Sequence, residues 1–100
     1  MKLYFTSQYT KKIADDAKKE FRPRANLIRT IILNNLYNFN DSEIRGGKKP
    51  KPRHNTKLET VTLADDEYNE LEKIAKHYNM TPTKLVAFII NQYYEEKENE

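Results

Sequence analysis

The chain has 100 residues, of which 37% are hydrophobic and 33% charged, so it can form one small core and cannot hold several independent domains. Because it has no cysteine, a disulfide framework and a thiolate metal site are both excluded, and no apolar run reaches the length of a signal peptide or a membrane span. The net charge of +3 is unevenly spread: residues 1–56 carry 13 Lys and Arg against 5 Asp and Glu, whereas residues 57–100 carry 5 against 10.

The first part of the chain predicts a strand followed by two helices. Residues 2–5, KLYF, alternate polar and apolar side chains, which is the period-two pattern of a half-buried strand. Ile13 and Ala17 share one face of an expected helix, and the run LIRTII at 27–32 supplies the apolar positions of a second helix.

Residues 40–56, NDSEIRGGKKPKPRHNT, form a conspicuous break. Both glycines and two of the four prolines lie here, together with several basic side chains and almost nothing apolar. A segment of this composition cannot bury a core, so we interpret it as a basic flexible linker between two halves, residues 1–39 and 57–100.

The part of the chain after the linker predicts the same order of elements. TVTL at 60–63 alternates as a strand does, and the acidic cluster that follows is typical of a first helical turn. We expect one helix from Asp65 to Tyr78, ended by Asn79, and a second from Pro82 to about Glu96. Thr81 is the expected cap of the second helix.

A shift of 58 residues places the second half over the first without a gap. It lays KLYF over TVTL and LIRTII over LVAFII, and it keeps the apolar positions of the helices in phase. We interpret this as a diverged internal duplication. Because a lone strand leaves its backbone groups unpaired, each strand is expected to pair with the strand of the other half, and the two halves are expected to share one core.

This arrangement resembles the ribbon-helix-helix family of repressors, the Arc and MetJ class. The second half is the closer match, and its strand TVTL, helix segment LEKIA and turn NMT are similar to those of small plasmid copy-number repressors. The first half departs from the pattern, because Phe21 and Arg22 occupy the usual Gly-apolar turn and Pro23 stands where a capping Ser or Thr is expected. The resemblance implies a mostly α fold with a two-stranded antiparallel β-ribbon, in the order β-α-α, linker, β-α-α.

The resemblance also implies how DNA would be bound. The ribbon of the family enters the major groove, and its outward side chains read base edges; these positions are Lys2, Tyr4, Thr6, Thr60 and Thr62. The start of each second helix contacts phosphate through backbone amides and the helix dipole; the residues concerned are Arg22, Arg24, Thr81, Thr83 and Lys84. Contacts of the linker with phosphates or a minor groove would come from Lys48, Lys49, Lys51 and Arg53.

The sequence therefore predicts a cytoplasmic, sequence-specific double-stranded DNA-binding protein, most simply a transcriptional repressor. Two alternatives stay open: an accessory DNA-binding factor for plasmid transfer or partition, and an antitoxin-like protein-interaction module. No catalytic or metal-binding constellation is found, so neither enzymatic activity nor a cofactor is expected. The linker allows the halves to pair within one chain as a pseudo-dimer, while pairing between chains and further self-association on DNA are also compatible with the sequence.

Overall fold

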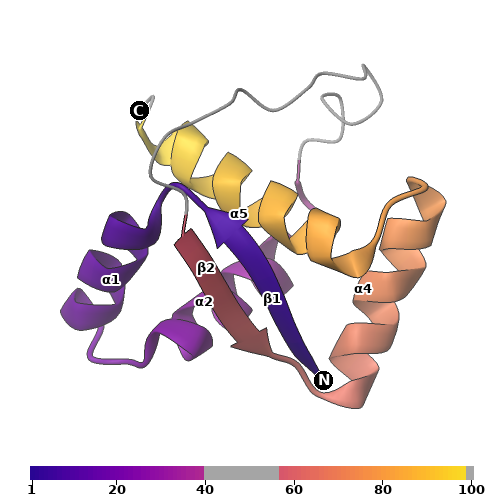
Figure 1. The fold of residues 1–100 in the computed structure, drawn as a ribbon, viewed down its shortest axis with the longest axis horizontal. Coiled ribbons are helices and arrows are strands. Elements are labelled where there is room, and N and C mark those ends of the chain that lie inside the picture. The colour runs from indigo at the N-terminus through magenta and orange to yellow at the C-terminus, as the bar shows by residue number, and fades with distance from the viewer. Residues whose placement is uncertain (40–56, 99–100) are drawn as a thin grey trace.

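The structure, a computed structural model, describes residues 1–39 and 57–98. The described elements follow one another as β1 (Lys2–Ser7), α1 (Thr10–Lys19), α2 (Arg24–Asn35), β2 (Lys57–Thr62), α4 (Asp65–His77) and α5 (Pro82–Glu98). The described residues are thus mostly helical with a two-stranded antiparallel sheet, as expected (Figure 1). None of the described helices is both long and apolar enough to cross a membrane.

The two strands pair with each other along their whole length. β1 and β2 run antiparallel, with Lys2 opposite Thr62 at one end and Ser7 opposite Lys57 at the other. Each strand has six residues, so the predicted spans of four residues were too short. The predicted strand at 60–63 was also misplaced, because Leu63 lies just beyond β2 and β2 begins three residues before Thr60.

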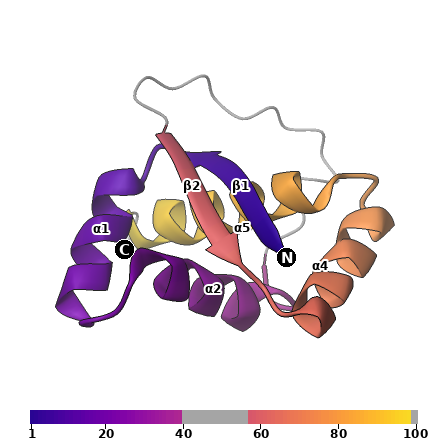
Figure 2. The same cartoon turned by 60° about the horizontal axis from the view of Figure 1, so that its bottom comes forward.

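The helices and strands of the two halves are interleaved. β1 packs against α5, and β2 packs against α2, so each strand lies on the second helix of the other half. α2 and α5 also contact each other, while α1 packs on α2 and α4 packs on α5. Figure 2 shows the ribbon crossing over α2 and α5, with α1 and α4 at the two ends. Neither half contains a complete core of its own.

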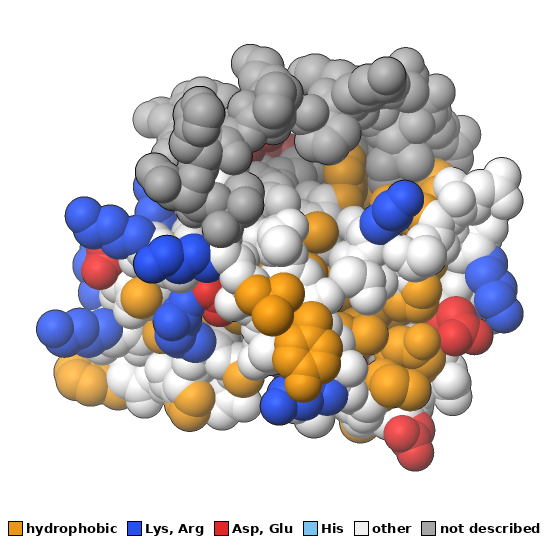
Figure 3. All heavy atoms as spheres, in the orientation of Figure 1, with side chains coloured by type: hydrophobic (Ala, Val, Ile, Leu, Met, Phe, Trp, Pro, Cys, Tyr) orange, Lys and Arg blue, Asp and Glu red, His pale blue; other side chains and the backbone are white. Residues whose placement is uncertain are grey.

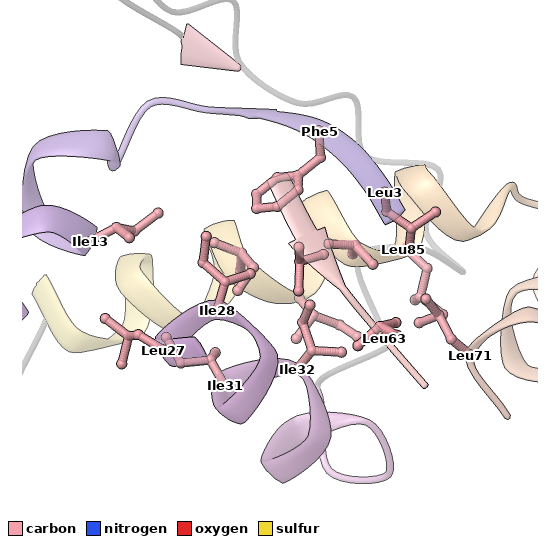
Figure 4. Close-up of a cluster of buried hydrophobic side chains, with 14 of the residues drawn as sticks. Leu3, Phe5, Ile13, Leu27, Ile28, Ile31, Ile32, Leu63, Leu71 and Leu85 are labelled. Carbon is pink, nitrogen blue, oxygen red and sulfur yellow. The ribbon is translucent and has the colours of Figure 1, made fainter. Parts of the chain in front are cut away.

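One hydrophobic cluster fills the space between the ribbon and the helices. Its members come from both halves and include Leu3, Phe5, Ile13, Leu27, Ile28, Ile31, Ile32, Val61, Leu63, Leu71, Leu85, Val86, Ile89 and Ile90. Figure 4 shows Leu3 and Phe5 pointing from β1 toward the helices. The predicted inward positions of both strands are therefore confirmed, since Leu3, Phe5 and Val61 are all buried.

The two helix boundaries that flank the turn in each half are separated by 58 positions. The first helix of each half ends at Lys19 and at His77, and the second helix begins at Arg24 and at Pro82. The first helices start differently, because α4 has an additional acidic turn at its amino end.

The turn between the helices has the same backbone geometry in both halves. Phe21 and Asn79, again 58 positions apart, are the described non-glycine residues with positive φ, at 53° and 56°. Asn79, the predicted end of the first helix in the second half, thus lies in the left-handed region that asparagine tolerates. Phe21 adopts it without the local polar side chain that makes Asn tolerant of this region, and its ring is 96% exposed.

A buried hydroxyl on α5 yields a first prediction. Tyr94 is fully buried and stacks on Tyr9 with ring centroids 5.6 Å apart, and its hydroxyl has no hydrogen-bond partner among the described residues. Burial, and next the nearby Asp16 carboxylate, raise the pKa of Tyr94. We expect Tyr94→Phe to raise the free energy of unfolding by about 1 kcal/mol, because it removes an unpaired buried polar group and keeps the ring. Tyr94→Ala is the matched control and should cost about 3 kcal/mol.

Urea unfolding of the three proteins tests this prediction. A loss of stability in Tyr94→Phe would contradict it and would show that the hydroxyl is paired in solution, by the nearby Asp16 carboxylate or by a buried water.

Candidate nucleic-acid interface

The face of the ribbon that points away from the helices carries six side chains in three cross-strand pairs, which we call the outer face. The pairs are Lys2 with Thr62, Tyr4 with Thr60, and Thr6 with Leu58. All five side chains that the sequence predicted to contact bases lie on this face. Thr60 is half-buried and the other four are exposed. The sixth residue, Leu58, was not among the predicted contacts.

The amino-terminal end of β1 combines a cation with an aromatic ring. Lys2 and Tyr4 are two residues apart on one strand, so their side chains point to the same face. The Lys2 ammonium lies 5.5 Å from the centroid of the Tyr4 ring, which is within cation–π range, and the Tyr4 side chain is half-exposed. A hydrogen-bond donor and a flat apolar surface are therefore presented next to each other.

At its start, β2 inverts the usual hydrophobic pattern. Leu58 points outward and is 64% exposed, whereas Glu59 points inward and is 5% exposed. The physical reason is Arg24 at the start of α2, whose guanidinium Nη2 donates to Glu59 Oε1 and neutralises the buried carboxylate. Because a leucine outside and a glutamate inside contradict a hydrophobic alternation, the strand predicted from the sequence began too late, at Thr60, and left out Leu58.

Both arginines predicted to contact phosphate have partners within the protein. Arg24 forms the ion pair with Glu59 and keeps 45% of its side chain exposed. Arg22 Nη1 donates to Thr30 Oγ1 at 3.2 Å, and 37% of its side chain is exposed. Pro23, at the cap position of α2, makes no side-chain cap hydrogen bond, as the sequence predicted from its lack of a hydroxyl. A positive charge remains accessible beside this helix start, but Arg24 has a structural role that the sequence did not reveal.

The start of α5 has the predicted cap. Thr81 Oγ1 accepts the backbone N–H of Lys84 at 3.2 Å, and Pro82 occupies the first helical position. Thr81 and Lys84 are exposed and Thr83 is half-buried, so these three residues are grouped at one exposed helix end. The positive end of the helix dipole and the Lys84 ammonium both favour an anion there.

A charge-assisted pair joins the two halves behind the ribbon. Arg29 of α2 donates through Nε to Glu67 Oε1 at 3.0 Å and through Nη2 to Oε2. Glu67 Oε1 also accepts the Ala64 N–H at 2.8 Å, which satisfies a backbone donor at the start of α4. The hydrogen bonds from Arg29, and next the one from Ala64, hold the pKa of Glu67 below its usual range.

This lowered pKa predicts how stability responds to acid. A depressed folded-state pKa means that the contribution of Glu67 is fully present above the unfolded-state pKa of about 4.3 and is lost as pH falls through the folded-state pKa. We therefore expect Glu67→Gln to be less stable than the parent protein at pH 7, with the difference shrinking as the pH falls below about 4.3 and through the lowered folded-state pKa. Urea midpoints measured across this range check it. Glu72→Gln on the same helix is the control, and an equal pH response in both variants would contradict the prediction.

Charge is distributed unevenly around the ribbon. α1 carries Lys11, Lys12, Lys18 and Lys19, and Figure 3 shows Lys and Arg side chains gathered over this helix. The first turn of α4, at the other end of the molecule, carries three acidic residues. The outer face is thus flanked by one basic and one acidic helix. The predicted linker contacts at Lys48, Lys49, Lys51 and Arg53 lie outside the residues that the structure describes.

Comparisons of this chain with protein-family models, with curated proteins and with solved structures found no match.

Proposed function

We propose that this protein is a sequence-specific double-stranded DNA-binding protein that inserts its β-ribbon into the major groove. The proposal rests on the outer face, where six side chains of the two-stranded ribbon point away from the hydrophobic core. A ribbon of this kind fits a groove about 12 Å wide, and the residue types suit base edges. Lys2 can donate to guanine O6 or N7, and the threonines offer hydroxyl groups and methyl groups.

The interleaved packing supports a tandem ribbon-helix-helix architecture. We infer that the two halves are diverged copies of one β-α-α unit, because the end of the first helix, the positive-φ turn residue and the start of the second helix recur 58 positions apart. In such a pseudo-dimer the two strands lie in the groove together, as in the symmetric members of the family. Here their outward residues differ, so the recognised site is expected to be asymmetric and not a perfect palindrome.

Phosphate contacts would orient the ribbon. In this proposal the capped start of α5 and the arginine-flanked start of α2 each approach a backbone phosphate, and the lysines of α1 add charge on one side. The simplest biological role is repression of transcription by occupying a promoter. An accessory role in plasmid transfer or partition would use the same contacts at a different site.

Selection from random-sequence duplex DNA at two salt concentrations tests the function. We expect the parent protein to enrich one asymmetric motif and the variant Lys2→Ala/Thr60→Ala/Thr62→Ala to lose it. Lys73→Ala, which removes a single positive charge from the exposed part of α4, is the matched control and should enrich the same motif as the parent. If the protein bound DNA without enriching a motif, and salt weakened binding steeply for all sequences, binding would be purely electrostatic. The ribbon would then not recognise base sequence, and the proposal would be wrong.

A further inference from the structure

The two ends of the outer face differ in chemical character. One end presents the Lys2 ammonium beside Thr62, and the other end presents the Leu58 side chain beside the methyl and hydroxyl groups of Thr6. Leu58 is the one residue of this face without a polar atom in its side chain, and it is among the most exposed large apolar residues described. One end of the outer face therefore offers a hydrogen-bond donor, and the other end offers an apolar surface.

The position of Leu58 is set by the ion pair beneath it. A shift of β2 by one residue would exchange its two faces and would expose Glu59 while burying Leu58. Arg24 holds the Glu59 carboxylate on the inner face, which keeps the register and directs the Leu58 side chain outward. The exposure of this leucine is thus enforced by the core, so Leu58 cannot turn inward to escape solvent.

We infer that Leu58 is a specificity-determining residue that packs on the C5 methyl group of a thymine at one end of the recognised site. The inference rests on the proposed function and deepens it. Among the base edges in the major groove, the thymine methyl is the apolar one, and it is the group that an exposed aliphatic side chain complements.

The spacing along the ribbon adds a second expectation. Thr6, opposite Leu58, is four residues from Lys2, which corresponds to about 13 Å of strand. At about 3.4 Å per base pair, a thymine read by Leu58 and a guanine read by Lys2 are expected to be about four base pairs apart. Polarity of this kind also fixes the direction in which the pseudo-dimer lies on its site.

Substitution of deoxyuridine for thymidine, one position at a time, tests the inference on the duplex enriched by selection. Deoxyuridine lacks only the C5 methyl group. We expect one position to weaken binding of the parent protein about fourfold, the value of one buried methyl group. Leu58→Ala should bind the thymidine and deoxyuridine duplexes equally, and because Leu58 is exposed this variant should fold. Lys2→Ala is the control, and it should keep the methyl dependence while losing preference at the guanine.

The outcomes separate this inference from the proposed function. An enriched motif in which no deoxyuridine position matters, or a penalty that persists unchanged in Leu58→Ala, would overturn the role of Leu58 and leave the DNA-binding function standing. Failure of the parent protein to enrich any motif would overturn both.

Discussion

Arg24→Ala is expected to destabilise the protein by about 3 kcal/mol, a large part of the roughly 5–15 kcal/mol of a domain of this size. The reason is that Glu59 is 5% exposed on the inner face of β2 and Arg24 supplies its positive partner. Removing one member of such a pair leaves an uncompensated charge in the core. The expected loss is at the lower end of the usual range, because the half-exposed Arg24 side chain shows that water reaches the pair from one side.

A double substitution distinguishes pairing from packing. Arg24→Met/Glu59→Leu replaces both charges by apolar groups of similar length and should recover the stability of the parent protein, or exceed it. Lys73→Ala, an exposed cation on α4, is the control for loss of charge and should change stability by less than about 0.5 kcal/mol. Urea unfolding at pH 7 provides the measurement. If Arg24→Ala were as stable as the control, Glu59 would have to be solvated, and the inverted pattern of β2 would need another explanation.

The same ion pair shows where inference from sequence ends. Alternation of polar and apolar residues placed Leu3, Phe5 and Val61 correctly on the inner face, because burial on one side of a strand imposes a period of two. That rule failed at Leu58 and Glu59, where a contact with a residue 35 positions away reverses it. A local pattern carries no information about such a contact. Only the folded arrangement brings Arg24 under the start of β2.

Most of the candidate interface could be predicted from the sequence, but the partners of its arginines could not. Five of the six outer-face side chains followed from the alternation, and the Thr81 cap followed from a local hydroxyl before a helix-starting proline. The partners of Arg22 and Arg24 were not predictable, because both arginines looked like free cations in a basic segment. The resemblance to the ribbon-helix-helix family suggested what such positions do in that family, but the internal pairing of Arg24 is a property of this chain's own packing.

Phe5→Ala and Tyr4→Ala, substitutions of adjacent residues on opposite faces of β1, should separate stability from DNA recognition. Phe5 is 2% exposed and belongs to the shared core, so its loss should cost about 3–5 kcal/mol and lower the unfolding temperature by roughly 15 °C or more. Tyr4 is 49% exposed on the outer face, so its loss should change stability by less than about 0.5 kcal/mol.

DNA binding should respond in the opposite way. Tyr4→Ala removes the ring that lies beside the Lys2 ammonium, and we expect about a tenfold loss of affinity for the enriched duplex with little change for random duplex DNA. Phe5→Ala, measured at a temperature where it remains folded, should keep the preference of the parent protein for that duplex, because Phe5 is buried under the ribbon and leaves the outer face unchanged. The two effects are expected to be independent because successive residues of β1 face either the helices or the outer face. If Tyr4→Ala instead unfolded the protein and left sequence preference intact, the outer face would be a structural surface, and the proposed mode of DNA recognition would be wrong.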